Sequence, residues 1–287
     1  MKSRLKLSAC LLMIGCCQLL LAQAPALPIK SGDKIVFMGD SITAEGGVPS
    51  GYCQLVIMGL ATNGVQVTLA GVAGVSGNKS NQMLERLQKD VLDRKPDWMT
   101  LSCGVNDVYH GGNGIPLEQY KQNITAIVDH CQAAGVKVMI LTATMIHEDP
   151  DDPYNQELAG YNDFLRELAK EKKCLLADLN AEMQAAVKRI GAPKTFHALT
   201  RDGLHMNPLG NQVMAIGVLK EFGLSEEQIQ KVKEAWLNIP CGVNAQARIT
   251  VRQFQQLNDM ALHQNRSLDD LIGEQLTKAA EKLLETK

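Results

Sequence analysis

Lys34-Ile-Val-Phe-Met-Gly-Asp-Ser-Ile-Thr43 is the stretch around which the chain is organised. Residues 35–38 form a short apolar run, the pattern of a parallel strand that is buried on both faces. The run stops at Gly39-Asp40-Ser41, and small residues then lead towards a helix. A serine placed there lies at the carboxyl end of a strand, where an open α/β sheet has its ligand crevice. The same residues also fit an ordinary turn in which Asp40 or Ser41 caps the helix.

Four further strand-like runs follow, and helical patterns separate them. The runs are Val65–Ala70, Trp98–Cys103, Val138–Ala143 and Cys174–Leu179. Apolar residues recur at helical spacing in the segments 52–62, 83–91, 116–134 and 155–172. Strands that alternate with helices form βαβ units, which build a parallel sheet with helices on both faces. The sequence therefore predicts an α/β fold.

The N-terminus has the composition of an export signal. Basic residues precede an apolar run from 7 to 22, and Ala22-Gln23-Ala24 has the small residues that a signal peptidase reads. We expect residues 1–24 to be a signal peptide and the protein to be secreted or periplasmic. Lipid anchoring at Cys16 is a less favoured alternative, because apolar residues continue past it. The run is short for a membrane span, so we expect no stable membrane insertion of the mature chain.

The rest of the chain divides into an α/β domain over residues 30–224 and a helical extension over residues 225–287. The tail is charged and glutamine-rich and has no strand signal, so it either packs on the main domain or mediates oligomer contacts. The formal net charge is −2, and no basic stretch is interleaved with aromatic residues. This composition excludes a nucleic-acid partner.

Glycine and polar residues follow the second and third strands, at the same predicted sheet edge as Ser41. Gly74-Val-Ser-Gly77-Asn-Lys-Ser80 comes first, and a glycine lets a backbone N–H approach a ligand closely. Gly104-Val-Asn106-Asp107 comes second, where the Asn106 amide either points at an oxyanion or organises its own loop. Taken singly, each segment is more often an ordinary turn.

The segment Thr200-Arg-Asp202-Gly-Leu-His205-Met-Asn-Pro208 precedes a helical pattern at 213–219. Asp202 and His205 are three residues apart, a spacing that puts them on one side of a helical turn. The carboxylate can then hold one imidazole nitrogen while the other faces outwards. A lone histidine is usually structural, but this pair near a serine indicates a catalytic dyad.

These residues supply each role in acyl transfer. Ser41 would be the nucleophile, His205 the general base and then acid, and Asp202 the residue that orients the imidazole. The Ser41 N–H, the Gly77 N–H and the Asn106 side-chain amide would form an oxyanion hole. We expect Asp40 and Asp107 to be supporting residues, and we expect no metal or other cofactor.

The blocks Gly39-Asp40-Ser41, Gly77, Gly104-Val-Asn106-Asp107 and Asp202-Gly-Leu-His205 together resemble those of the SGNH (GDSL) hydrolase family. The resemblance covers residues 34–219, although the first block reads Gly-Asp-Ser-Ile instead of Gly-Asp-Ser-Leu. It implies a flavodoxin-like three-layer α/β/α sandwich with a five-stranded parallel sheet. It also implies metal-free serine esterase chemistry on acyl esters or thioesters. The Gly-x-Ser-x-Gly elbow of ordinary α/β-hydrolases is absent around Ser41.

Three classes of function fit the sequence. The leading hypothesis is a secreted serine esterase that hydrolyses small-molecule or glycan acyl esters through an acyl-enzyme. Within that class we favour acetyl esters on carbohydrate over lysophospholipase or thioesterase activity. A metal-dependent phosphoesterase would instead use Asp40, Asn106, Asp107 and His205 as ligands, although no two histidines have ligand-pair spacing. The third class is a non-catalytic binding module on the same fold.

An acidic segment bears on the substrate. Its carboxylates are Glu148, Asp149, Asp151 and Asp152. If they rim the pocket, they would repel anionic substrates such as phospholipids. The alternative interpretation is a solvated loop. The glycine-rich segment Gly111-Gly-Asn-Gly114 would give the pocket an open rim that suits sugars.

Overall fold

The computed structural model describes residues 27–191, 197–242 and 249–285. The expected signal peptide at residues 1–24, including Cys16, lies outside the described residues. No helix within the described ranges is long and apolar enough to cross a membrane. The chain divides into two compact units, one that ends at Cys241 and one from Gly242 to Lys287.

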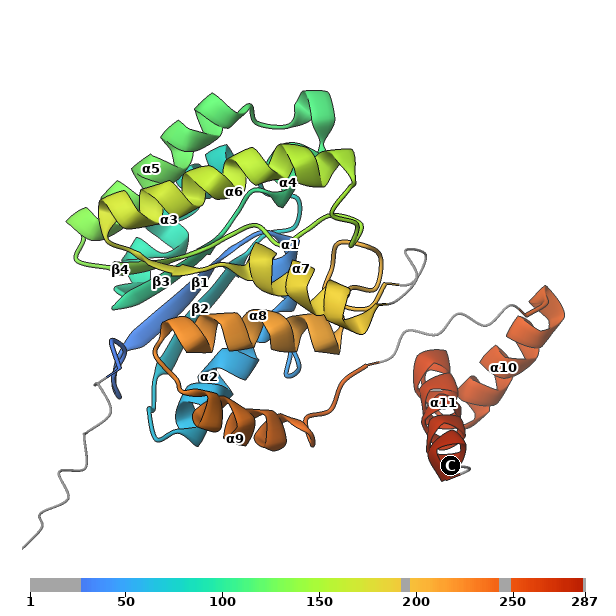
Figure 1. The fold of residues 1–287 in the computed structure, drawn as a ribbon. Coiled ribbons are helices and arrows are strands. Elements are labelled where there is room, and N and C mark those ends of the chain that lie inside the picture. The colour runs from blue at the N-terminus through green and yellow to red at the C-terminus, as the bar shows by residue number, and fades with distance from the viewer. Residues whose placement is uncertain (1–26, 192–196, 243–248, 286–287) are drawn as a thin grey trace, which may run out of the picture. The chain divides into compact units, whose positions relative to one another are not determined.

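The first unit is built on a parallel sheet of five strands in the order β2-β1-β3-β4-β5 (Figure 1). The strands are β1 Lys34–Gly39, β2 Thr68–Gly74, β3 Trp98–Ser102, β4 Lys137–Leu141 and β5 Leu175–Ala177. Residues 35–39 of β1 are all buried, as the apolar run predicts. This architecture confirms the predicted fold class. The strand order reverses between β1 and β3, which is where such a sheet binds its ligands.

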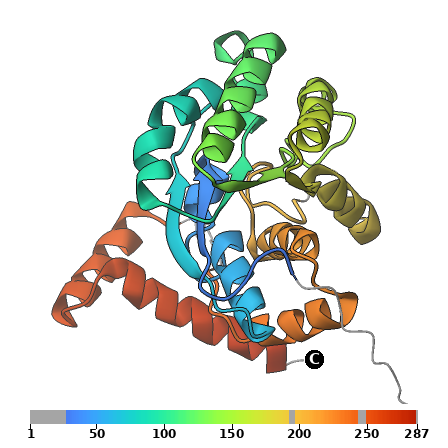
Figure 2. The same cartoon turned by 90° about the vertical axis from the view of Figure 1, so that its left-hand side faces the viewer.

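Helices cover both faces of the sheet (Figures 1 and 2). Helices α3, α5 and α6 form one layer, and α2, α7 and α8 form the other. The bounds are α1 Ser41–Glu45, α2 Tyr52–Thr62, α3 Ser80–Asp90, α4 Val105–Tyr109, α5 Leu117–Ala133, α6 Pro153–Lys172, α7 Leu179–Ile190, α8 Pro208–Glu221 and α9 Glu226–Trp236. The short helices α1 and α4 begin directly beyond β1 and β3, so their first residues lie at the carboxyl edge of the sheet.

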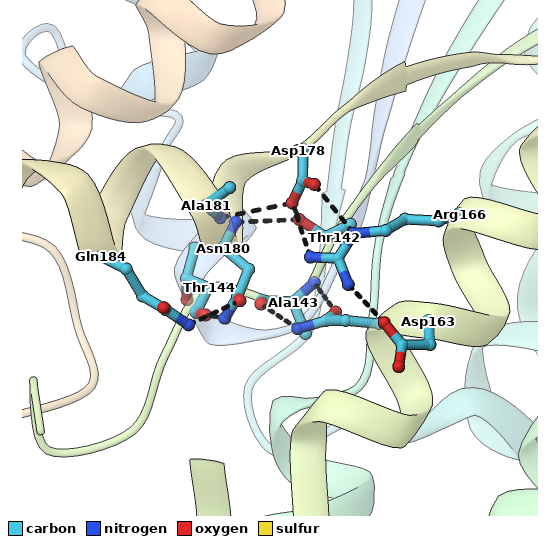
Figure 3. A network of polar contacts seen from close by, with 10 residues as sticks. Thr142, Ala143, Thr144, Asp163, Arg166, Asp178, Asn180, Ala181 and Gln184 are labelled. Atoms are coloured by element: carbon cyan, nitrogen blue, oxygen red, sulfur yellow. Dashed lines mark hydrogen bonds and ion pairs between the residues drawn. The ribbon is translucent and has the colours of Figure 1, made fainter. Parts of the chain in front are cut away.

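The short edge strand β5 is held by a polar network at its carboxyl end (Figure 3). Thr142, just beyond β4, donates its hydroxyl to Asp178, just beyond β5, over 3.0 Å. Arg166 of α6 donates to both oxygens of Asp178, over 2.8 and 3.0 Å. These hydrogen bonds join β4, β5 and α6, which compensates for a strand of only three residues. We assign the network a structural role.

The bounds of β2 differ most from the sequence-based expectation, and one helix has no counterpart in it. β2 begins at Thr68 instead of Val65 and extends to Gly74. The reason is its register, because Lys34 pairs with Thr68 and Gly39 with Gly74, so that β2 follows the full length of β1. The amphipathic pattern at α7, which directly follows β5, was not singled out in the sequence.

The helix α9 belongs to the first unit, which ends at Cys241, whereas the sequence pattern places the start of the C-terminal extension at residue 225. Its apolar residues Ile229, Val232 and Trp236 are buried. A Cβ added at Gly59 of α2 would lie 3.2 Å from Val232, so α9 packs closely on α2. The second unit contains α10 Val251–His263 and α11 Leu268–Glu285, and these helices confirm the helical tail.

Two paired glycines let α1 approach the sheet. Gly39 and Gly74 are neighbours in the register of β1 and β2. A Cβ at Gly74 would overlap the backbone of Ala44 in α1, and one at Gly39 would overlap the Thr43 side chain. The first turn after β1 can therefore lie against the sheet only because both positions lack a side chain.

We predict that Gly74→Ala lowers the free energy of unfolding by about 2 kcal/mol or more, because the methyl group meets backbone atoms that cannot move aside. Urea denaturation of purified protein measures this change. Gly112→Ala is the matched control, since a Cβ there has no neighbour within 4 Å. Equal stability of the two variants would contradict the close approach of α1.

Candidate active site

Ser41 is the first residue of α1, directly beyond the central strand β1. The Asp40 side chain caps this helix by accepting a hydrogen bond from the Ile42 N–H over 2.9 Å. The cap fixes the direction in which the chain leaves the strand. Ser41 is 7% exposed, so its hydroxyl lies in a largely water-excluded position at the sheet edge.

The imidazole of His205 lies between Ser41 and Asp202. Its Nε2 atom is 2.9 Å from the Ser41 hydroxyl oxygen, and its Nδ1 atom is 2.7 Å from the Asp202 carboxylate. The structure therefore brings together the three residues that the sequence singles out for catalytic roles. With Asp202 accepting from Nδ1–H, Nε2 is the nitrogen that carries a lone pair towards the serine.

The loop that carries this pair is not the helical turn that the three-residue spacing suggests. Residues 201–205 form bends ahead of α8, between Thr200 and Met206, which pair in an antiparallel bridge. Asp202 accepts hydrogen bonds from the backbone N–H groups of Leu204 and His205, over 3.0 and 2.8 Å. These bonds form a local Asx-type turn, so the carboxylate shapes the loop and also holds the imidazole. Burial tends to raise the pKa of Asp202, but the hydrogen bonds from His205 and Leu204 outweigh it and lower the pKa.

Two backbone N–H groups that the sequence assigns to the oxyanion hole are unengaged. Within the described part of the chain, neither the Ser41 N–H nor the Gly77 N–H has an acceptor. Gly77 has φ +74°, and a Cβ added there would have no neighbour within 4 Å. The glycine permits this left-handed backbone and leaves open space beside it.

Asn106 is buried beside the site, but its amide donors are already engaged. Its Nδ2 atom donates to the Asp40 carboxylate over 3.1 Å and to the Asn78 carbonyl over 3.2 Å. An amide nitrogen has only two hydrogens. Asn106 can therefore serve an oxyanion only by sharing or exchanging one of these bonds, a condition that the sequence does not reveal.

Asp40 and Asp107 are both buried carboxylates that hold loops together. Burial raises the pKa of Asp40 to about 6, against the lowering effect of the hydrogen bond from Ile42 and with a further rise from the nearby Asp107 charge. Asp107 accepts from the Ser80 N–H over 2.9 Å and so ties α4 to the start of α3. Burial also raises the pKa of Asp107, and its hydrogen bonds with Ser80 oppose that rise.

The four carboxylates of the acidic segment differ in exposure, because Glu148 is buried, Asp149 and Asp152 are half-buried and Asp151 is exposed. Glu148 is buried, and its carboxylate accepts hydrogen bonds from the backbone N–H groups of Ala198, Leu199 and Thr200, over 2.8, 3.0 and 2.6 Å. The Thr200 hydroxyl donates to the same carboxylate. Glu148 thus anchors residues 198–200, the segment that leads to Asp202. Neither interpretation of the acidic segment anticipated this role.

Arg86 of α3 is a second positioning residue that the sequence does not indicate. Its guanidinium donates to the Gly39 carbonyl over 2.7 Å, to the Ala73 carbonyl over 2.9 Å and to the Asn78 side chain over 2.7 Å. It therefore joins the ends of β1 and β2 to the loop that contains Gly77. The rigid fork of an arginine suits such a set of three acceptors.

Comparison with known proteins finds several esterases that are similar to this chain. Residues 37–213 match the GDSL-like lipase/acylhydrolase family. The chain is 25% identical over 216 residues to an acetylxylan esterase of Geobacillus stearothermophilus, across 69% of this chain and 97% of that enzyme. It is 23% identical over 212 residues to an isoamyl acetate-hydrolyzing esterase of Schizosaccharomyces pombe, across 72% of this chain and 78% of that enzyme. The crystal structure of the acetyl xylan esterase AlAXEase superposes with a TM-score of 0.61 at 33% identity, across 65% of this chain and 98% of that one.

The pKa of Asp40 predicts a pH dependence of stability. Because its folded pKa of about 6 lies above the ordinary aspartate pKa of 3.8, the native state binds more protons than the unfolded state between these values. The contribution of Asp40 to stability therefore falls as pH rises from about 4 to 6. We expect the unfolding free energy of the wild type, relative to Asp40→Asn, to fall by about 2 kcal/mol between pH 4 and pH 7.

Urea denaturation at a series of pH values measures this difference. Asp93→Asn is the control, because Asp93 is exposed. If the wild type and Asp40→Asn differ by the same amount at every pH, the inferred pKa of Asp40 is wrong.

Proposed function

The chain belongs to the GDSL-like lipase/acylhydrolase family and is a carboxylic ester hydrolase; we propose that it removes acetyl groups from carbohydrate through an acyl-enzyme intermediate on Ser41. The observation that carries the mechanism is the bridging position of the His205 imidazole, at hydrogen-bond distance from both the serine hydroxyl and the Asp202 carboxylate. A hydroxyl, an imidazole and a carboxylate in this order are the parts that acyl transfer requires.

In the first half of the reaction, the Ser41 oxygen attacks the ester carbonyl carbon while Nε2 of His205 takes the hydroxyl proton. Asp202 keeps Nδ1 protonated and stabilises the imidazolium that forms. The tetrahedral intermediate then collapses. Its ester C–O bond breaks, and His205 returns the proton to the departing alcohol oxygen, which leaves an acetyl group on the serine.

In the second half, a water molecule takes the place of the alcohol. His205 removes a proton from this water as it attacks the acyl-enzyme carbonyl, and the serine oxygen then leaves with that proton. The products are acetate and the free enzyme. In both halves the same imidazole acts as base and then as acid. Its Nε2 atom exchanges the proton with the serine, alcohol or water oxygen that reacts in each step.

The oxyanion of each tetrahedral intermediate would be held by the backbone N–H groups of Ser41 and Gly77. Support for this assignment comes from the absence of an acceptor for either group among the described residues. Each such donor typically contributes about 3 kcal/mol of barrier stabilisation. We assign Asn106 as the third donor, with the negative oxygen taking over the hydrogen that it gives to the Asn78 carbonyl.

The hydrogen bonds of His205 also weigh against the metal-dependent phosphoesterase alternative. A histidine binds a metal through the lone pair of a ring nitrogen. Here Nδ1 is directed at Asp202 and Nε2 at Ser41. A metal ligated by His205 would have to displace one of these partners, whereas serine catalysis uses both as they stand.

The choice of acetylated carbohydrate rests on the relatives. The chain covers 97% of the Geobacillus acetylxylan esterase and 98% of the AlAXEase structure, so the similarity extends over their whole domain and not over one motif. The Schizosaccharomyces relative also hydrolyses an acetate ester. The substrates named for these relatives share an acetyl group and differ in the alcohol. This supports a small acyl group in the substrate of this chain. We further propose export of the mature chain, which cell fractionation of the full-length protein would test.

We predict that Ser41→Ala lowers kcat/KM for p-nitrophenyl acetate by about 10³-fold or more, because the acyl-enzyme can no longer form. Ser50→Ala is the matched control. Ser50 lies between α1 and α2, and its hydroxyl has no hydrogen-bond partner among the described residues. Wild-type turnover by purified Ser41→Ala protein would refute the serine as the nucleophile.

The substrate proposal predicts a preference for short acyl groups. We expect kcat/KM for p-nitrophenyl esters to be highest at C2 and to fall towards C12, and we expect release of acetate from acetylated xylan. Maximal rates at long chains, or turnover of lysophospholipid in place of acetylated xylan, would favour the lysophospholipase or thioesterase alternative.

A further inference from the structure

Three aromatic rings from separate parts of the chain gather beside the site. They are Tyr109 at the end of α4, His147 between β4 and α6, and Tyr154 in the first turn of α6. The ring centroids are 5.8 Å apart for Tyr109 and His147, 5.4 Å for Tyr109 and Tyr154, and 6.1 Å for His147 and Tyr154. Each ring thus contacts the other two, and we call them the aromatic cluster.

The cluster is accessible to solvent. Tyr109 is 39% exposed, and the His147 side chain is 40% exposed. The rings meet at angles of 55° to 79° and are not stacked face to face. Large aromatic side chains that only stabilise a fold are usually covered, so an exposed cluster of this kind is a candidate binding surface.

His147 connects the cluster to the loop that carries Asp202 and His205. Its backbone N–H donates to the Gly203 carbonyl over 2.7 Å. A Cβ added at Gly203 would lie 3.2 Å from both the Cα and the ring Cδ2 of His147. The imidazole of His147 therefore packs directly against the chain between the orienting carboxylate and the catalytic imidazole.

Tyr109 connects the cluster to the other side of the site. It lies three residues after Asn106 in the same short helix, which is one helical turn. Asn106 in turn contacts Asp40, the residue before the serine. The cluster is therefore continuous with the site through two independent segments of chain.

The conformation of His147 is unusual and is held in place by its surroundings. His147 and Glu148 have φ of +59° and +53°, a left-handed region that is unfavourable for a non-glycine residue. The buried carboxylate of Glu148 holds one end of this segment. At the other end, Asp152 lies 3.0 Å from His147 Nδ1 and accepts from the Tyr154 N–H over 2.9 Å. One carboxylate thus caps α6 and also contacts the His147 imidazole, which ties His147 to the first turn that carries Tyr154.

The chemistry of the cluster suits a sugar ring. The face of a pyranose presents C–H groups, which are attracted to the electron-rich faces of aromatic rings, while its hydroxyls project from the edge. Within the described residues, the hydroxyls of Tyr109 and Tyr154 and the Nε2 atom of His147 have no hydrogen-bond partner. They are free to bind those hydroxyls. Apolar ring faces with a few polar groups at their edges are typical of small-molecule sites.

We propose that Tyr109, His147 and Tyr154 bind the sugar ring that carries the acetyl ester, an inference that rests on the proposed carbohydrate esterase function. The serine and imidazole act on the acyl group, and the aromatic cluster holds the alcohol part of the substrate. Hydrolysis of an ester without a sugar does not involve the cluster.

The test compares two substrates in three variants. The substrates are an acetylated xylo-oligosaccharide and p-nitrophenyl acetate, and the variants are Tyr109→Ala, Tyr109→Phe and Met58→Ala. For Tyr109→Ala we expect KM for the oligosaccharide to rise about three- to tenfold, with kcat/KM for p-nitrophenyl acetate within about twofold of the wild type. Tyr109→Phe keeps the ring and should restore most of the lost affinity. Met58, on α2, is 37% exposed and serves as the control for truncation of a surface side chain.

The outcomes separate this inference from the proposed function. If the wild type cleaves the oligosaccharide and Tyr109→Ala cleaves it equally well, the inference is overturned and the esterase proposal stands. If Tyr109→Ala loses activity on both substrates alike, the cluster is structural and the inference is again overturned. If the wild type cleaves p-nitrophenyl acetate but not the oligosaccharide, the carbohydrate proposal fails, and the sugar site fails with it.

Discussion

The hydrogen bond between the Ser41 hydroxyl and the His205 imidazole joins residues that are 164 positions apart, and most of the polar structure at the sheet edge maintains it. A hydrogen bond of this kind weakens steeply with small changes in distance and angle. Both ends therefore need rigid supports. The serine is held by the Asp40 cap and by the glycines that let α1 lie on the sheet. The imidazole is held by the Asx-type turn of Asp202 and by the Glu148 carboxylate beneath it.

Buried carboxylates supply much of this rigidity. A carboxylate that is removed from water is costly unless hydrogen bonds compensate for the lost hydration. Asp40, Asp107 and Glu148 each accept backbone N–H groups from chain segments that carry parts of the site. In each case the hydrogen bonds that compensate the buried carboxylate also hold a loop in position. Truncation of any of the three to alanine would leave backbone donors without these acceptors, so the effects should spread beyond the local contact.

The loop after β4 links catalysis to the proposed recognition of the alcohol. Glu148 points inwards and anchors the chain that leads to Asp202, while His147, its neighbour, points towards Tyr109 and Tyr154. The two residues share a left-handed backbone, which directs consecutive side chains to these different tasks. His147 also bonds to Gly203 in the loop that carries His205, so a change in the position of that loop would move one ring of the aromatic cluster. Such coupling would keep the reacting ester and the sugar ring in register with each other.

The sequence by itself determined the fold class and the residues that meet at the site, because both depend on local patterns. Alternating strands and helices specify a parallel sheet, and strand ends of such a sheet share one edge, so Ser41 and Asn106 could be placed together without coordinates. His205 follows no strand, and the sequence indicated it through its spacing from Asp202. The tertiary structure decided what depends on partners distant in the chain. Arg86 and Glu148 looked like ordinary charges on α3 and in an acidic loop, and only their buried acceptors and donors reveal them as supports. Three further features were not predictable for the same reason: the engaged amide of Asn106, the packing of α9 on α2 and the contact of the three aromatic rings. Each is a contact between segments that are distant in the chain, and neither segment's sequence indicates its partner.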